Sequence, residues 1–304
     1  MISLVIPLYN EVPGFKKLIQ EIKSTTSLQG DQWEVVLVDD GSTDDTWLLL
    51  QQLDPQPLRM KAIRFSRNFG KEAAIYAGLS EADGNPVIVM DGDGQHPPSI
   101  LPEMIRKWKE GALIVEAVKM KRPPEPTWRR LFTAFFYKIF RYATGLDLTT
   151  ATDFKLLDRK VVESYLALPE RNRFFRGLIK WFNYPTQEIA FEPLQRQKGA
   201  SSWPFKNLVS FAWNAIVSFS VWPLRALMAI GVAGIVGTVL LLFQTLYCKF
   251  SGKAAPGFST VIILQLLLGS SILFGLGLVG EYISKIYEEL KMRPRYVVLE
   301  RFER

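Results

Sequence analysis

Two long stretches without a charged residue constrain this chain more than any other feature of its sequence. One runs from Ala226 to Cys248 and the other from Ala254 to Gly280. A helix of about 20 apolar residues crosses a bilayer core, so each stretch is long enough to span it. We therefore predict a transmembrane hairpin over 226–284, with helices at about 226–248 and 256–280. The alternative is a pair of buried core helices, which rarely extend this far without a charge.

The basic residues that follow the second stretch predict how the chain is oriented. They are Lys285, Lys291, Arg293, Arg295, Arg301 and Arg304. Positive residues next to a membrane helix favour the cytoplasmic side. We expect a protein of the inner (plasma) membrane with two helices, both termini in the cytoplasm, and a cytoplasmic basic tail over 285–304.

The first part of the chain, 1–203, has the pattern of an α/β domain. Short runs rich in Val, Ile and Leu predict strands at Ser3–Pro7, Glu34–Val38, Lys61–Phe65, Pro86–Met90 and Leu113–Ala117. Amphipathic segments between them predict helices at Phe15–Ser24, Asp45–Leu53, Lys71–Ser80 and Ile100–Lys109. This alternation is typical of a Rossmann-like, mostly parallel sheet covered on both faces. In such sheets, ligands bind beyond the carboxyl ends of the strands.

Polar clusters stand at the ends of three of these predicted strands. They are Pro7–Glu11, the acidic pair Asp39–Asp40 with the residues after it, and Asp91–Asp93. Turn formation could account for any one of them, because Asp, Gly, Asn and Ser favour turns. Three clusters at the same edge of one sheet favour a ligand site there.

The third cluster predicts a divalent cation. Asp91 and Asp93, with Gln95, offer the oxygen ligands that Mg²⁺ or Mn²⁺ takes, and substrate phosphates complete such sites. A chain of formal net charge +7 that gathers carboxylates here suits a metal-bound diphosphate better than a bare phosphate. His96 either supports this site or has a structural role at a helix start. With one histidine and one cysteine, the chain has neither a zinc cluster nor an intramolecular disulfide.

Two stretches combine basic and aromatic residues. The stretch 204–225 lies directly before the first apolar run, so we predict juxtamembrane amphipathic helices at the lipid headgroups. The stretch 128–142 either lies at the same interface or forms a core helix with a basic edge. Because the stretch 204–225 adjoins a membrane anchor, we do not expect nucleic acid as a partner.

The motifs resemble those of family 2 glycosyltransferases, which have the GT-A fold. This likeness is carried by Ile6–Glu11, Val38–Asp44, Arg67–Lys71 and Asp91–Pro98. Within the family, the chain is similar to the polyisoprenyl-phosphate glycosyltransferases, which include bactoprenol glucosyltransferases and dolichol-phosphate mannose synthase. That closer likeness rests on Arg64–Ala74, Thr152–Leu156, Pro169–Gly177, Leu278–Tyr287 and Arg293–Tyr296.

The resemblance implies roles for individual residues. Donor binding would involve Pro7, Tyr9, Glu11, Asp39, Asp40, Lys71 and Gly92, and metal coordination would involve Asp91, Asp93 and Gln95. Asp153 occupies the catalytic aspartate position, and acceptor or phosphate binding would involve Arg171, Arg176, Arg196, Ser201 and Ser202. Ser202 stands where the family motif has lysine, so the usual phosphate contact there would fall to Lys198 or Lys206.

The resemblance also implies a reaction. It would be the inverting transfer of a hexose, best matched by glucose from UDP-glucose, to undecaprenyl phosphate, giving a β-linked lipid phosphosugar for cell-envelope glycan modification. UDP-N-acetylglucosamine, UDP-galactose and GDP-mannose are alternative donors, and a homo-oligomer, such as a tetramer, would be the assembled form. A processive polysaccharide synthase is disfavoured because the chain lacks a Gln-x-x-Arg-Trp motif. A non-catalytic nucleotide-binding membrane scaffold would need neither the acidic pair nor Asp153.

Overall fold

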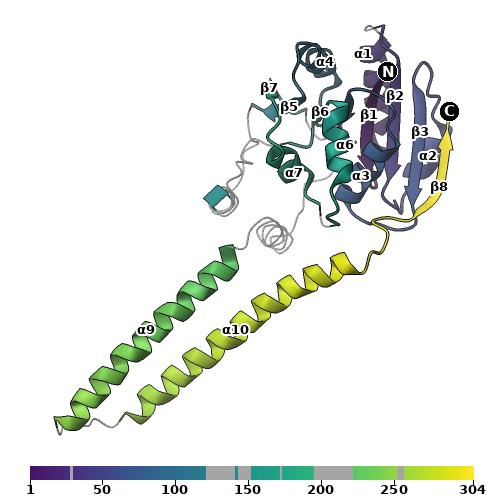
Figure 1. Ribbon diagram of the computed structural model, residues 1–304. Helices are drawn as coiled ribbons and strands as arrows, with labels where there is room; N and C mark the ends of the chain where they lie inside the picture. Colours follow the sequence, from purple (N-terminus) through teal and green to yellow (C-terminus); the bar gives the residue numbers. More distant parts are fainter. Residues whose placement is uncertain (28–29, 121–140, 143–151, 172, 195–221, 252–256) are drawn as a thin grey trace. The chain divides into compact units, whose positions relative to one another are not determined.

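The computed structural model describes the chain except for residues 28–29, 121–140, 143–151, 172, 195–221 and 252–256 (Figure 1). The chain divides into two compact units, which we describe separately. Unit 1 comprises Met1–Leu208 with Arg293–Arg304, and unit 2 comprises Val209–Met292. The predicted phosphate ligands Arg196, Ser201 and Ser202 lie outside the described residues, as does most of 128–142 and of 204–225.

A mixed, mostly parallel sheet forms the centre of unit 1. Its described strands run in the order β7-β5-β6-β4-β1-β2-β3-β8. They are β1 Ile2–Leu8, β2 Trp33–Asp39, β3 Arg59–Phe65, β4 Val87–Val89, β5 Ile114–Lys119, β6 Lys155–Leu157, β7 Thr186–Phe191 and β8 Val298–Glu303. β1 pairs in parallel with β2 and β4, and β6 pairs antiparallel with both β4 and β5. The five predicted strands are confirmed as β1 to β5.

Helices connect and cover these strands. Those described in unit 1 are α1 Val12–Ser27, α2 Thr46–Gln52, α3 Lys71–Glu81, α4 Leu101–Lys109, α6 Arg159–Ala167 and α7 Phe175–Trp181, with the 3₁₀ turn η1 Pro98–Ile100 before α4. α1 buries Phe15, Leu18, Ile19 and Ile22, the spacing of one apolar helix face. Asp158 precedes α6 as its N-cap, and its carboxylate accepts a hydrogen bond from the Lys160 N–H. The four predicted helices are confirmed as α1 to α4.

The last strand, β8, was not predicted from the sequence. Figure 1 shows it in yellow beside β3, with which it pairs antiparallel from Lys61↔Glu303 to Phe65↔Val298. The indole Nε1 of Trp47 donates to Glu300 Oε2 at 3.0 Å, and the rings of Trp47 and Phe302 lie 5.3 Å apart. The chain end that reads as a basic tail therefore also supplies an edge strand of the sheet.

The described part of unit 2 contains two long helices, α9 Trp222–Phe250 and α10 Phe258–Leu290. Among the described residues, the segment Leu267–Leu290 within α10 is the one helix long and apolar enough to cross a membrane. The helices contact each other at Gly275, where an added Cβ would lie 3.1 Å from a methyl carbon of Leu227. Small residues at such positions let two helices approach closely.

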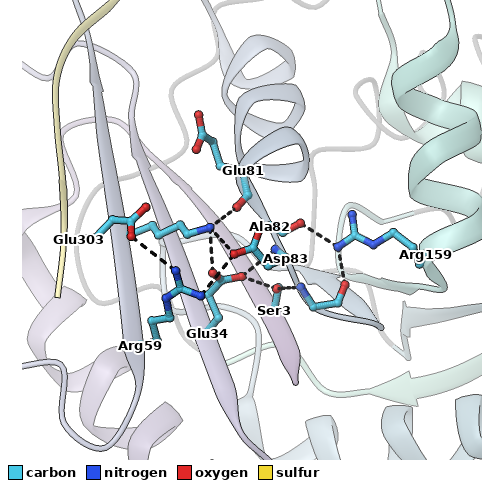
Figure 2. Close-up of polar contacts among 10 residues, drawn as sticks. Ser3, Glu34, Arg59, Glu81, Ala82, Asp83, Arg159 and Glu303 are labelled. Carbon is cyan, nitrogen blue, oxygen red and sulfur yellow. Dashed lines mark hydrogen bonds and ion pairs between the residues drawn. The ribbon is translucent and has the colours of Figure 1, made fainter.

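A network of charges around the buried Lys61 and Glu34 lies near the amino ends of β2 and β3 (Figure 2). The ligand site was predicted at the carboxyl ends of the strands. Lys61 Nζ lies 3.1 Å from Glu34 Oε1 and 2.7 Å from Asp83 Oδ2. Glu34 Oε2 also accepts hydrogen bonds from the Ser3 hydroxyl at 2.6 Å and from the Asp83 N–H at 3.0 Å. The network attaches the connection between α3 and β4 to the sheet, because Asp83 lies in that connection.

We expect Lys61→Met to lower the free energy of unfolding by about 3 kcal/mol, because Glu34 would keep a buried charge without its ammonium partner. The control is Arg59→Met on the same strand. Arg59 also pairs with Asp83, but its side chain is 47% exposed, so about 1 kcal/mol or less should be lost. Urea unfolding of the detergent-solubilised protein measures both. Equal losses would contradict a buried role for Lys61, and adding Glu34→Gln to Lys61→Met should recover part of the loss.

Candidate active site

The register of β4 and β6 brings two distant acidic residues to the same edge of the sheet. Val89, in β4, is paired with Lys155, in β6, and the two strands run antiparallel. Asp91 follows Val89 by two residues, and Asp153 precedes Lys155 by two residues. Both carboxylates therefore lie at the carboxyl end of β4, where a ligand site was predicted.

Lys71, the first residue of α3, joins these two carboxylates. Its Nζ lies 2.5 Å from Asp91 Oδ1 and 2.5 Å from Asp153 Oδ2. Arg176 of α7 binds Asp153 through both oxygens, with Nε 2.6 Å from Oδ1 and Nη2 2.7 Å from Oδ2. Burial would raise the pKa of Asp153, but the charges of Arg176 and Lys71 outweigh it and hold that pKa well below its usual range.

A second charged pair, Glu116 and Lys155, holds the backbone next to Asp153. Glu116, in β5, contacts the ammonium of Lys155 and accepts a hydrogen bond from the Thr152 N–H at 3.0 Å. The Thr152 hydroxyl donates to the Ala117 carbonyl at 2.5 Å. Glu116 was not singled out from the sequence, although a glutamate inside the apolar run Leu113–Ala117 signals a buried charge that needs a partner.

The first two predicted clusters lie together at this edge. The Asn10 side-chain oxygen accepts a hydrogen bond from the Thr43 N–H at 2.9 Å, and the Asn10 N–H donates to the Ser42 hydroxyl at 2.9 Å. The Glu11 N–H donates to the Thr46 hydroxyl at 3.2 Å. Of the donor-binding residues implied by the resemblance, Pro7 is buried in β1 and Tyr9, just after it, is 44% exposed.

The two acidic residues at the end of β2 accept hydrogen bonds from two different loops. Asp40 accepts hydrogen bonds from the Phe69 and Gly70 N–H groups at 2.7 and 2.9 Å, directly before α3 begins. Asp39 accepts one from the Ser42 N–H at 3.0 Å, and its other oxygen lies 3.5 Å from Arg64 Nε without a hydrogen bond. Burial raises the pKa of Asp39, and it raises that of Asp40 to about 6.

Gly41 explains why the two loops can touch. It has φ +65°, and a Cβ there would collide with the backbone of Arg67. The loop after β2 thus lies against the loop after β3, so Asp40 can reach the N–H groups that precede Lys71. Asp40 thereby helps to fix the position of Lys71.

The loop after β4 holds the predicted metal ligands. The Asp91 N–H donates to His96 Nδ1 at 3.1 Å, and the buried His96 ring stacks on Phe154 with centroids 4.7 Å apart. Burial lowers the pKa of His96, so it is neutral and its Nδ1 lone pair is occupied. His96 therefore supports the Asp91 backbone. Gly92 packs against the Leu8 side chain, where a Cβ would collide.

Asp91 and Asp93 could hold a divalent cation if substrate phosphates supplied further oxygen ligands. Asp91 Oδ1 is buried, and among the described residues it pairs with the Lys71 ammonium alone. Asp93 Oδ1 accepts a hydrogen bond from the Gln95 N–H at 3.0 Å, and the Gln95 side-chain oxygen lies 3.4 Å from Lys119 Nζ. The described residues hold no group of three His, Cys, Asp or Glu side chains that would bind a metal alone. Two carboxylates suffice for Mg²⁺ when phosphates are also bound.

The arginines expected at phosphates have different surroundings. Arg176 contacts Asp153, and Arg171 lies between α6 and α7. Arg173 was not predicted to have a role. It is 7% exposed and donates to the carbonyl oxygens of Tyr165 and Leu168, both at 2.5 Å.

Comparison with known proteins identifies the family of this chain. Residues 3–166 match the family described as Glycosyl transferase family 2. The chain belongs to this family. The acidic edge of its sheet is therefore the candidate active site of a glycosyltransferase.

Similar proteins cover nearly the whole of this glycosyltransferase. It is 37% identical over 301 residues to the uncharacterized glycosyltransferase YkcC of Bacillus subtilis, covering 97% of this chain and 92% of that protein. It is 34% identical over 304 residues to the SfII prophage-derived bactoprenol glucosyl transferase of Shigella flexneri, covering 98% and 97%. The chain is thus related over nearly its full length to bactoprenol glucosyl transferases.

A solved structure shares the fold. Glucosyl-3-phosphoglycerate synthase from Mycobacterium tuberculosis, in complex with Mn²⁺, UDP-glucose and phosphoglyceric acid, matches 72% of this chain and 78% of its own. The TM-score is 0.52 and the sequence identity is 19%. This likeness, together with the family match, identifies the sheet as GT-A-like.

Glu72 offers a pH test of this site. Its Oε2 accepts a hydrogen bond from the Phe175 N–H at 2.8 Å, and burial together with the Asp153 charge raises its pKa from 4.5 to about 8. Between these two values the folded protein holds a proton that the unfolded chain releases, so stability should fall as pH rises from about 4.5 to about 8. Glu72→Gln should remove this pH dependence. Its melting temperature should therefore fall less between pH 6 and pH 9 than that of the parent protein.

Thermal unfolding at several pH values measures this difference. The exposed Glu163→Gln, on α6, is the control and should follow the parent curve. If Glu72→Gln also runs parallel to the parent, Glu72 holds no proton at neutral pH.

Proposed function

We propose that this glycosyltransferase transfers glucose from UDP-glucose to undecaprenyl phosphate with inversion, giving a β-linked lipid phosphosugar for cell-envelope glycan modification. The observation that carries the proposal is the Lys71 ammonium between Asp91 and Asp153, at the carboxyl end of β4 in a GT-A-like sheet. The full-length similarity to bactoprenol glucosyl transferases supports the choice of acceptor and sugar. The lipid acceptor is consistent with an apolar helix at Leu267–Leu290.

A phosphate acceptor changes what Asp153 has to do. The second pKa of a phosphate monoester is about 6, so the attacking oxygen is largely ionised at neutral pH. Little remains for a base to remove, and alignment with charge compensation supplies most of the rate. Asp153, whose pKa lies far below its usual range, suits this role as an anion that orients Arg176 and Lys71. These two cations would then face the phosphate oxygens.

The donor would bind along the carboxyl ends of β1, β2 and β4. Asp39 has an oxygen without a hydrogen bond for the base or ribose, and Glu11 and Tyr9 border the same edge. Asp91 and Asp93 would hold Mg²⁺ or Mn²⁺, with Gln95 as a third oxygen ligand. When bound, the cation would stabilise the charge of the departing nucleoside diphosphate. Arg171, Arg196, Ser201 and Ser202 would complete the phosphate contacts.

The reaction is tested by incubating membranes with labelled UDP-glucose, a short-chain polyprenyl phosphate and Mg²⁺ or Mn²⁺. Label should pass into an organic-extractable lipid, and parallel assays with UDP-N-acetylglucosamine, UDP-galactose and GDP-mannose identify the donor. Saturable nucleotide binding without transfer would instead indicate a scaffold.

Asp153→Asn should lower turnover by about 100-fold or more while UDP-glucose still binds, because the charge that orients Arg176 and Lys71 is lost. Turnover is measured with the lipid-transfer assay, and donor affinity by calorimetry. The exposed Asp31→Asn serves as the control and should retain activity. Near-normal activity of Asp153→Asn would remove this carboxylate from the mechanism.

Chelation should abolish transfer, and Mg²⁺ or Mn²⁺ should restore it, because Asp91 and Asp93 need a cation to hold the diphosphate. Asp93→Asn should raise the metal concentration needed for half-maximal rate. Full activity of the parent protein after metal removal would rule out this role for the acidic pair.

We also propose that α9 and α10 form a transmembrane hairpin in the inner membrane, with the catalytic domain and both termini in the cytoplasm. Basic residues after α10 support this orientation. In a Cys248→Ser background, Ser251→Cys should react with an impermeant maleimide on intact spheroplasts, whereas Ser80→Cys should react only after lysis. Labelling of Ser80→Cys before lysis would reverse the proposed topology.

A further inference from the structure

The segment between α10 and β8 contacts the catalytic domain through Arg295, Tyr296 and Val297. The Tyr296 ring stacks on Phe65 with centroids 4.7 Å apart, and the Val297 carbonyl accepts a hydrogen bond from the Ser66 N–H at 2.9 Å. Arg295 Nη2 donates to the carbonyl oxygens of three consecutive residues, Leu168, Pro169 and Glu170, at 3.2, 3.0 and 3.0 Å. Only the residues from Lys291 to Pro294 separate Arg295 from the end of α10. A guanidinium next to the membrane helix in sequence thus holds one turn of the catalytic domain.

A second guanidinium, that of Arg173, holds the same turn. Besides the Tyr165 and Leu168 carbonyls, Arg173 donates through Nε to the Glu170 carbonyl at 3.1 Å. The Tyr165 carbonyl is among the last four of α6, which have no partner within the helix, so Arg173 also caps that helix. Two arginines far apart in sequence therefore share the carbonyls of Leu168 and Glu170.

The same two guanidinium groups share an aromatic ring. Their Cζ atoms lie 4.3 Å (Arg173) and 4.4 Å (Arg295) from the centroid of Tyr76, in α3. Burial lowers the pKa of Arg173, and the charge of Arg295 lowers it further. Two cations at one ring repel each other, and the converging carbonyls and the ring face offset this cost.

Arg295 is not needed to attach the tail. β8 pairs with β3 along its length, and Trp47 contacts both Glu300 and Phe302. The tail would remain on the sheet without Arg295, so the carbonyl contacts have another effect. They hold the turn Leu168–Glu170 in place.

That turn leads directly to the residues assigned to the acceptor. Arg171 follows Glu170, and α7 begins at Phe175, whose N–H donates to Glu72 at the start of α3. One residue later, Arg176 binds both oxygens of Asp153. The position of the turn therefore affects where both phosphate-binding arginines lie.

We propose that Arg295 is a positioning residue for the acceptor phosphate: it holds the turn Leu168–Glu170 so that Arg171 and Arg176 keep their places. The inference rests on the proposed function, because that function assigns these two arginines to the lipid phosphate. It makes the acceptor side of the site depend on the segment that emerges from the membrane helix, while the donor side does not.

The test compares Arg295→Ala, Arg295→Lys and Arg304→Ala in the full chain, reconstituted in nanodiscs. Arg304 is a matched control, because it also lies in the tail and donates to carbonyls, those of Gln51 and Leu53, at the end of α2. Arg295→Ala should raise the KM for polyprenyl phosphate about tenfold and leave the KM for UDP-glucose within about twofold, as expected for loss of charge-assisted hydrogen bonds on one side of the site. Arg295→Lys should have a smaller effect, and Arg304→Ala should change neither KM.

A second measurement does not require activity. Hydrogen exchange at 168–171 and 173–177 should be faster in Arg295→Ala than in Arg304→Ala. Unchanged exchange there, or equal changes of both KM values, would overturn the proposal. If the parent protein transfers no sugar to lipid, the proposed function fails, and the exchange result alone decides whether Arg295 positions the turn.

Discussion

The antiparallel pairing of β6 with β4 is the constraint on which the site depends. It reverses the chain direction at one strand of an otherwise mostly parallel sheet and places Asp153 beside Asp91. Two carboxylates this close would repel each other, and Asp153 is only 4% exposed, so its charge requires compensation. Lys71 and Arg176 supply it, one from the start of α3 and the other from α7.

The same requirement explains the residues around the site. Glu116 and Lys155 are both buried beneath Asp153, where they pair with each other and hold Thr152. Asp40 fixes the loop that delivers Lys71. Each charge in a buried network needs its partner in position. Substitutions at these residues would therefore move the Asp153 carboxylate, although the residues themselves are not assigned to substrate binding.

Much of the fold could be predicted, because local sequence determines it. Strands β1 to β5 are short apolar runs, and the helices between them have one apolar face. Contacts between residues that are distant in sequence could not be predicted in this way. Nothing near Asp153 indicates that it meets Lys71 and Asp91, and its role came only from a resemblance. Strand β8 was missed because its alternating residues include charges that resemble a basic tail.

The location of the candidate site could be predicted, but the contacts within it could not. The edge of the sheet and its acidic clusters follow from strand ends, whereas the supporting residues do not. The phosphate contact expected of Arg176 stays a prediction, but its pairing with Asp153 was not anticipated. The buried Arg173 was not anticipated either, because arginines usually lie at surfaces.

The position of β8 has a consequence for biosynthesis. Its residues leave the ribosome after both long helices, yet they pair with β3. The nascent catalytic domain therefore keeps an open strand edge throughout translation of α9 and α10. The sheet of this domain cannot be completed before β8 has been made, so a chain cut short after α10 would be left with an unprotected strand edge that is prone to aggregate.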